Sequence, residues 1–278
     1  MFNNKYIRYI KINKKSLLIT LLLTITCGIT LYFLVQKWDR VVVRENVVKI
    51  SKKQKNLYLL DAGHGATSHR NGNNYVQSGD TLFWEYAYVF EIRDILSEML
   101  NASNIYNVYV DSFTHKRNLG INERVDLINT YYKVMKEVHK ADHSLLVVSL
   151  HANHSRNIEA TGIEVLTNIN KADKYFENPD FFKNEMISVS ELLADKIALY
   201  SGLPLRKKSG KKYKLTDRVG ILKRTRCYAV LSENGFFSNP DERALMSTKQ
   251  FKTKIAYAHY VVICQIEEIK PIPIELWM

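Results

Sequence analysis

The sequence predicts an α/β domain with a mostly parallel, twisted sheet covered by helices on both faces, preceded by an N-terminal transmembrane helix. From residue 57 to residue 268, short apolar runs alternate with helical patterns, which is typical of strands joined by crossover helices. The chain has 278 residues and is 46% hydrophobic and 24% charged. It therefore has enough apolar material for a packed core, which excludes a disordered or low-complexity protein.

The predicted membrane helix is a run of 19 residues, 17–35, without a charged side chain. At the rise of an α-helix it spans about 28 Å, close to the hydrocarbon thickness of a bilayer. Five basic residues and no acidic one precede it, so the positive-inside rule predicts a cytoplasmic tail at 1–16 and a signal-anchor helix at 17–36. Cleavage near Cys27, as in a signal peptide, is the alternative; in both cases the rest of the chain works outside the cytoplasm, on the periplasmic or cell-wall side.

The net charge of +12 comes from 40 Lys and Arg against 28 Asp and Glu, and half of the excess lies in the first 38 residues. The remainder is only mildly basic and has no spacing typical of a nucleic-acid-binding module, so we expect no nucleic-acid partner. Residues 37–56 are polar and rich in lysine and are interpreted as a linker. We expect one folded domain at 57–270 and a short C-terminal tail at 271–278.

Apolar runs bounded by polar residues or turns predict the strands. In chain order they lie at residues 57–60, 105–110, 145–148, 162–167 and 228–231. Stripes of apolar residues at spacings of three and four predict the helices. The first helix begins with a cap at Asp80 or Thr81, and the others cover residues 122–138, 184–201 and 249–268. In the last helix we expect inward-facing side chains that include Ile269.

The exported part has two cysteines, Cys227 on a predicted strand and Cys264 on the last helix. In an oxidising compartment two thiols can pair as a disulfide. Two buried free cysteines are the other interpretation.

Polar side chains collect where the predicted strands end, at the edge of the sheet where α/β proteins place their functional groups. His64 follows the first strand, His151 and Asn153 follow the third, and Glu233 follows the last. Glu85 lies in the first turn of the first helix, on the stripe that faces the sheet. Singly, each has a structural explanation, such as a surface histidine or a carboxylate at a helix N-terminus. Their coincidence at one edge predicts a metal site.

Two imidazoles and one carboxylate are a known ligand set for catalytic zinc, which keeps a further position for water. We therefore expect His64, Glu85 and His151 to bind Zn²⁺. A carboxylate that does not bind the metal can take a proton from water and pass it to the leaving amine. Glu233 is the candidate for that general base.

Two further residues are candidates for substrate binding. Asn153, beside a predicted ligand, either hydrogen-bonds substrate or orients its loop. Arg124, on the second helix, either fixes substrate or forms an ion pair with an acidic side chain. A third feature is a group of six basic residues at 206–214, which is either a solvated loop or a contact for an anionic polymer or for substrate carboxylates.

Several of these segments resemble a known family. In order along the chain they are Asp61-Ala-Gly-His64-Gly65, the helix with Glu85, Asn122-Glu-Arg124, Ser149-Leu-His151-Ala-Asn153, Gly162-Ile-Glu-Val165 and Ser232-Glu233-Asn-Gly-Phe-Phe-Ser-Asn239. They resemble the zinc-dependent N-acetylmuramoyl-L-alanine amidases of amidase type 3, over roughly residues 57–268.

This resemblance implies an α/β fold, one zinc ion and peptidoglycan as substrate. The bond cleaved would be the amide between N-acetylmuramic acid and L-alanine. The family's ligand pattern carries over onto His64, Glu85 and His151, and its catalytic glutamate onto Glu233. A catalytically silent peptidoglycan-binding module and an exported zinc peptidase acting on another amide are the alternatives.

Overall fold

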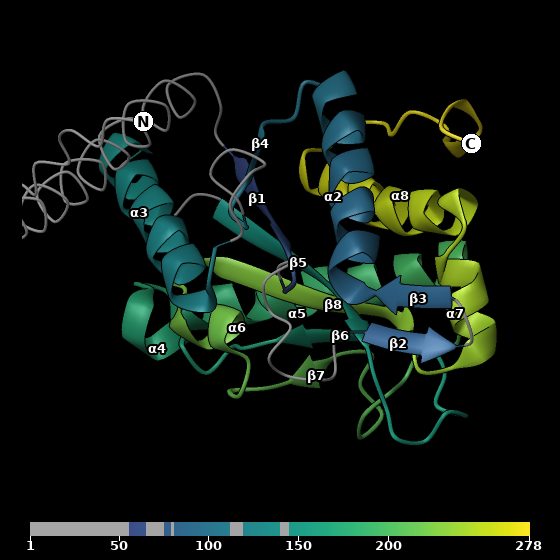
Figure 1. Ribbon diagram of the computed structural model, residues 1–278. Coiled ribbons are helices and arrows are strands. Elements are labelled where there is room, and N and C mark those ends of the chain that lie inside the picture. The colour runs from purple at the N-terminus through teal and green to yellow at the C-terminus, as the bar shows by residue number, and fades with distance from the viewer. Residues whose placement is uncertain (1–55, 65–74, 79–80, 112–118, 140–144) are drawn as a thin grey trace, which may run out of the picture. The chain divides into compact units, whose positions relative to one another are not determined.

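A six-stranded sheet forms the centre of the domain (Figure 1). The computed structural model describes residues 56–64, 75–78, 81–111, 119–139 and 145–278. The strand order is β4 (Asn107–Tyr109), β1 (Leu57–Ala62), β5 (Leu145–Asn153), β8 (Tyr228–Phe236), β6 (Ile163–Thr167) and β7 (Lys214–Leu215). The first four strands are parallel, whereas β6 runs antiparallel to β8 and β7 runs parallel to β6. The predicted α/β class with a mostly parallel sheet is confirmed.

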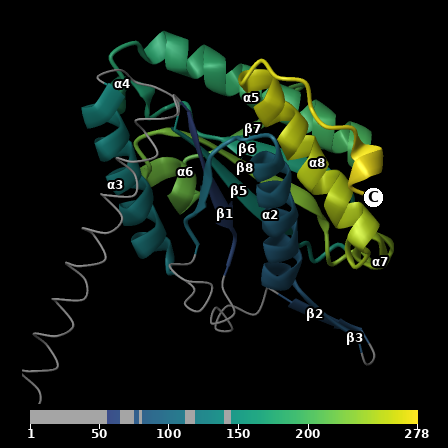
Figure 2. The same cartoon turned by 90° about the horizontal axis from the view of Figure 1, so that it is seen from above.

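Helices cover both faces of this sheet (Figure 2). On one face lie α2 (Glu85–Ala102), α5 (Pro179–Ser201) and α8 (Lys249–Ile266), and α8 packs against both of the others. On the other face lie α3 (Ile121–His139) and α6 (Gly220–Arg224). Shorter elements are α4 (Ala172–Tyr175), α7 (Pro240–Met246), the 3-10 helix η2 (Ile274–Leu276), and a hairpin of β2 (Tyr75–Ser78) and β3 (Thr81–Trp84).

The main core lies between the sheet and α2, α5 and α8. Because β1 is covered on both faces, all six of its residues are buried, as expected for a central strand of a parallel sheet. The apolar stripes of the helices supply the other half of this core, with fully buried side chains at Ile92, Leu96, Ile197 and Ile255. The sheet is thus a rigid platform whose strand ends present the polar residues.

The structure corrects three of the predicted boundaries. The cap at Asp80 or Thr81 is wrong, because Thr81–Trp84 forms a strand and α2 begins at Glu85 with Trp84 as its N-cap. Helix α5 begins at Pro179 rather than residue 184, since the Asn178 side chain accepts the Phe181 N–H and proline suits the first helical position. Ile269 lies beyond α8 and is exposed.

Strands β5 and β8 continue five residues past their predicted ends, to Asn153 and Phe236. They pair with each other along this extension, where His151 and Glu233 are register partners. Polar residues therefore form part of the ladder, which apolar patterning does not reveal. His151, Asn153 and Glu233 therefore lie on strands and not on the loops that follow them.

No helix in the described part of the chain is both long and apolar enough to cross a membrane. Residues 17–36, where the sequence predicts the anchor, lie outside that part. The segment treated as a C-terminal tail contains η2, and Trp277 in it packs near Tyr260 of α8. Cys227 and Cys264 are free and buried, which agrees with the second of the two interpretations.

Candidate metal centre

His64, Glu85 and His151 meet at the carboxyl edge of the sheet. Each offers one ligand atom, and these three atoms lie within 4.8 Å of one another. Glu85 Oε1 lies 3.1 Å from His151 Nδ1, and Glu85 Oε2 lies 3.4 Å from His64 Nε2. The two imidazole rings meet edge to face with centroids 5.0 Å apart. Among the described residues, this is the group of histidine, cysteine and acidic side chains that has the geometry to hold a metal ion.

His64 reaches the cluster through a sharp turn directly after β1. Its φ of 55° lies in the left-handed region, which is uncommon for a residue other than glycine and costs about 1–3 kcal/mol. The preceding residue, Gly63, donates its N–H to the Leu150 carbonyl at 2.8 Å and so continues the β1–β5 ladder. The strained turn brings the His64 imidazole close to His151, near the end of the neighbouring strand β5.

Glu85 comes from a helix, as the first residue of α2. It is only 3% exposed, and its Oε1 also accepts the Ala152 N–H at 3.0 Å. A buried carboxylate needs compensating positive charge or several donors. Two imidazoles and one backbone N–H face it here, so a divalent cation at this point would complete its environment.

The two imidazoles have different electrostatic surroundings. Burial lowers the pKa of His64, and His151 lowers it further, against the opposing effect of Glu85. Burial also acts to lower the pKa of His151, but the hydrogen bond and charge of Glu85 outweigh it and raise the pKa. Since a metal requires the neutral imidazole, metal and proton compete for the same nitrogen of His151.

Glu233 stands beside His151 on the neighbouring strand, as its register partner across β5 and β8. The residue is partly exposed, yet its Oε2 is buried and has no hydrogen-bond partner. Burial first, and then the charges of Glu85 and Glu164, raise the pKa of Glu233 to about 7. This carboxyl group can therefore gain and lose a proton near neutral pH, as a general base must.

Behind Glu233, three buried polar residues that sequence reasoning missed hold the strand ends together. His259 of α8 places Nδ1 2.8 Å from the Ile255 carbonyl, so Nδ1 is protonated and Nε2 accepts the Ser232 hydroxyl at 2.9 Å. Asn234 Nδ2 donates to Ser232 Oγ and to the His151 carbonyl. The sequence does show polar residues, Ser232 and Asn234, after an apolar run. It does not show that the partner of Ser232 is His259, which lies 27 positions later on a helix.

Arg124 lies in a buried ion pair below the cluster. Its Nη1 donates to Asp61 Oδ1 at 2.7 Å, and the Ser149 hydroxyl donates to Asp61 Oδ2 at 2.6 Å. Burial would raise the pKa of Asp61, but Arg124 and Ser149 outweigh burial and lower it. Arg124 is only 8% exposed. Through Asp61 and Ser149, Arg124 therefore holds the ends of β1 and β5 in place. Asp61 lies three positions before the candidate ligand His64.

Asn153 ends β5 and is partly exposed. Its Oδ1 accepts the N–H of His154 at 2.9 Å, and its own carbonyl accepts the Phe237 N–H. The side chain thus shapes the turn after β5 at the rim of the cluster. These contacts agree with a role of Asn153 in orienting the loop. A contribution of Asn153 to substrate binding stays a prediction.

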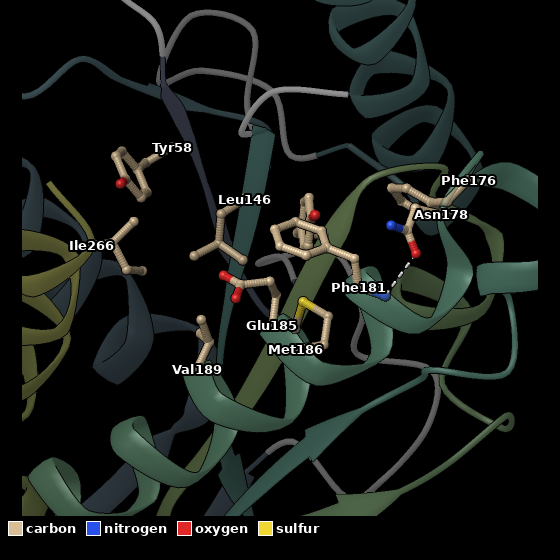
Figure 3. A pocket seen from close by; sticks show the side chains of 10 residues that line it. Tyr58, Leu146, Phe176, Asn178, Phe181, Glu185, Met186, Val189 and Ile266 are labelled. Carbon is tan, nitrogen blue, oxygen red and sulfur yellow. Dashed lines mark hydrogen bonds between the residues drawn. The ribbon is translucent and has the colours of Figure 1, made fainter. Parts of the chain in front are cut away.

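A cavity of about 270 Å³ lies elsewhere, over the amino-terminal ends of β1, β5 and β8 (Figure 3). Its lining is mostly apolar and includes Tyr58, Leu146, Phe181, Met186 and Ile266. Tyr58 and Leu146 are among the first two residues of their strands, so this cavity lies at the opposite edge of the sheet from the metal cluster. It belongs to the packing of α5 and α8 and not to the candidate site.

An α/β sheet with a His, Glu, His cluster at its carboxyl edge and an unpartnered glutamate beside it defines a candidate metallohydrolase. Comparison with known families makes this specific: residues 59–265 match the model of the N-acetylmuramoyl-L-alanine amidase family. The chain belongs to this family and is a hydrolase that acts on an amide bond of peptidoglycan.

Individual relatives agree with this assignment. A protein of Buchnera aphidicola, provisionally named an N-acetylmuramoyl-L-alanine amidase, is 23% identical over 226 residues, which cover 72% of this chain and 91% of the relative. Two solved structures share the fold. The amidase Ami1 from Mycobacterium smegmatis has a TM-score of 0.58 at 18% identity, with 76% of this chain and 95% of that one covered. An amidase from Clostridium difficile 630 has a TM-score of 0.57 at 20% identity, with 77% and 98% covered.

Proposed function

We propose that this chain is a zinc-dependent N-acetylmuramoyl-L-alanine amidase, tethered to the membrane, that cleaves the amide between N-acetylmuramic acid and L-alanine. His64, Glu85 and His151 would hold the zinc, and Glu233 would be the general base. The convergence of those three donors beside Glu233 carries this proposal. Family membership supports the substrate class, and the donor set supports the metal.

The donors fit zinc by their chemistry. Two imidazole nitrogens and one carboxylate oxygen, at mutual distances below 4.8 Å, match the set that zinc prefers in hydrolases. Zinc bound there would supply a Lewis acid to the amide carbonyl and lower the pKa of water. The backbone N–H of Ala152 orients the Glu85 carboxylate, and such outer contacts commonly tune metal affinity.

Glu233 would move the proton. Its Oε2 has no partner to compete with water, so it can accept a proton from the attacking water and deliver it to the nitrogen of the leaving alanine. The ladder between β5 and β8 keeps Glu233 beside His151, and the contact of Ser232 with His259 holds the strand from behind. Glu233 would therefore already be in position before the substrate binds, and binding would have to bring only the amide bond to it.

The membrane tether rests on residues 17–36 and on the basic residues before them. It would place the catalytic domain on the periplasmic or cell-wall side, where peptidoglycan lies. Fractionation of cells that produce the full chain tests it. The protein should remain in the membrane fraction after a high-salt wash, and externally added protease should degrade the domain in spheroplasts.

Incubation of the purified full-length protein with peptidoglycan tests the activity. New amino-terminal alanine and free muramic acid lactyl groups should form, and a chelator should prevent this. Glu233→Gln should lower the turnover about 10²- to 10⁴-fold, the usual contribution of a general base. Release at another bond would indicate a peptidase, and binding without release would indicate a silent module.

Zinc binding is tested separately by equilibrium dialysis. We expect one zinc per chain, lost in His64→Ala and in His151→Ala. His154→Ala is the matched control, because His154 is exposed and lies three residues from His151 but outside the cluster. Equal loss in all three variants would contradict the assignment of ligands.

A further inference from the structure

A second charged group lies next to Glu233, on the side away from the metal cluster. Glu164 of β6 is the register partner of Glu233, and His151 is the partner on the other side. Register partners on neighbouring strands project from the same face of a sheet, with Cβ atoms about 4.5–5.5 Å apart. His151, Glu233 and Glu164 therefore form one row across three adjacent strands.

Arg206 lies against the end of this row. Its Nε donates to Glu164 Oε1 at 2.9 Å, and its Nη1 donates to the Thr161 carbonyl at 3.1 Å. The guanidinium carbon lies 4.8 Å from the centre of the Phe236 ring. These contacts fix the guanidinium plane, while its side chain remains 42% exposed and its Nη2 has no partner among the described residues.

Lys214 adds a second positive charge at the same place. Its Nζ lies 3.7 Å from Glu164 Oε2, and its side chain is 37% exposed. Two cations thus share one carboxylate, which leaves a net positive charge beside the catalytic glutamate. A fixed, half-exposed arginine with an available N–H is suited to bind a carboxylate through charge-assisted hydrogen bonds.

The backbone that carries this group is itself fixed. The buried carboxylate of Glu242 accepts the N–H of Gly162 at 2.6 Å and that of Phe236 at 2.6 Å. It ties the start of β6 to the end of β8, and the bridge from Ile163 to Leu205 holds the segment before Arg206. Arg206 therefore has a defined position relative to Glu233.

The order of the strands, combined with the proposed roles of the metal and Glu233, indicates the part of the substrate that would reach Arg206. Of the three donors, His64 follows β1, Glu85 begins α2 and His151 lies on β5. Glu233 lies on the next strand, β8, and beyond it Arg206 contacts Glu164 of β6 and Lys214 begins β7. The base must lie close to the amine that it protonates, and this amine begins the stem peptide. On this argument the peptide would continue past Glu233 toward Arg206, and the glycan would lie on the side of the metal cluster.

We propose that Arg206, with Lys214, binds a free carboxylate of the stem peptide, and so makes the enzyme selective for stem peptides whose second residue carries a carboxylate in place of its carboxamide. This inference rests on the proposed amidase activity. It assigns substrate discrimination to residues outside the metal centre. The remaining basic residues of the 206–214 segment have no such contact with the row.

The test compares two soluble substrates, N-acetylmuramoyl-L-alanyl-D-glutamate and its isoglutamine counterpart, with purified full-length enzyme. The wild type should cleave the acid with a kcat/KM about 10-fold or more above that of the amide, since a hydrogen bond between charged groups contributes about 1.5–3 kcal/mol. Arg206→Gln should reduce this ratio to about one by raising KM for the acid, and Arg206→Lys should restore part of it. Lys214→Met should lower the ratio to a smaller extent.

Lys207→Gln is the matched control, with the same loss of charge one residue away, and should keep the wild-type ratio. Because the ratio is taken within each variant, a reduced amount of folded enzyme does not change it. Equal ratios in wild type and Arg206→Gln would overturn the proposal, as would a wild type that cleaves both substrates equally well. A wild type that cleaves neither would instead refute the amidase assignment.

Discussion

Gly63 and His151 are packed so closely that the glycine has no room for a side chain. A Cβ atom built at Gly63 would lie 2.1 Å from Cε1 of His151 and 2.4 Å from both ring nitrogens. The end of β1 thus forms one wall of the place occupied by an imidazole from β5. Position 63 determines where that imidazole stands.

We predict that Gly63→Ala displaces the His151 ring and weakens zinc binding about 10- to 100-fold, the range for losing an outer contact of a metal ligand. Competition with a chromogenic chelator measures this affinity. Gly120→Ala is the control, since the nearest atom to its Cβ is 3.6 Å away. Wild-type affinity in Gly63→Ala would contradict the assignment of His151 as a ligand.

Glu233→Gln should stabilise the metal-free protein at alkaline pH, although it lowers turnover. The pKa of Glu233 is raised from 4.5 to about 7, so its contribution to stability is complete below pH 4.5 and is lost as pH rises through 7. Above pH 7 the charged carboxylate destabilises the fold by roughly 3 kcal/mol, which glutamine avoids.

Urea unfolding of the metal-free proteins at pH 4 and pH 8 measures this difference. The variant should match the wild type at pH 4 and exceed it at pH 8. Glu159→Gln, at an exposed position, should change neither value. A difference between Glu233→Gln and wild type that is independent of pH would contradict the prediction.

Arg124→Leu should destabilise the fold by roughly 3–5 kcal/mol, because it leaves the buried Asp61 carboxylate without its cation. Arg124→Leu combined with Asp61→Asn removes that charge and keeps an acceptor for Ser149, so it should recover most of the loss. Chemical unfolding of the two single variants and the double variant gives the coupling energy. Unchanged stability with a raised KM would instead make Arg124 a substrate-binding residue.

His259→Gln should make the protein less sensitive to acid. Burial lowers the pKa of His259 to about 4, so its contribution to stability is complete above its ordinary pKa of 6.5 and is lost as pH falls toward 4. This loss amounts to roughly 3 kcal/mol in the wild type and is absent in the variant. The free energy of unfolding, followed from pH 7 to pH 4, should therefore fall less steeply in His259→Gln; parallel curves would refute the prediction.

The sequence predicts every strand of the six-stranded sheet except β7, and it also predicts the four long helices and the residues that meet at the edge of the sheet. Apolar runs mark β1, β5 and β8, and the polar residues that interrupt or follow them are His151 and Glu233. Glu85 is identifiable because it lies on the apolar stripe of α2, where a charged side chain is unusual unless it has a partner or a function. The structure brings the three expected ligands together.

Contacts between distant segments could not be predicted in this way. The pairs of Arg124 with Asp61 and of His259 with Ser232 depend on how helices lie on the sheet, and each residue alone has several possible partners. Glu164 lies near the start of an antiparallel strand, whereas reasoning from strand ends assumes parallel neighbours. The hairpin of β2 and β3 was missed because four-residue strands leave little periodicity to detect.

The reversed direction of β6 has an evolutionary consequence. Its beginning, and not its end, lies beside the base, so the segment that follows α5 arrives at the outer margin of the sheet. If Arg206 and Lys214 bind the stem peptide as proposed, substitutions at residues 206–214 would alter which peptides are bound and would leave His64, Glu85, His151 and Glu233 unchanged. Preference for peptidoglycan with a different degree of amidation would then need changes in this one surface segment only.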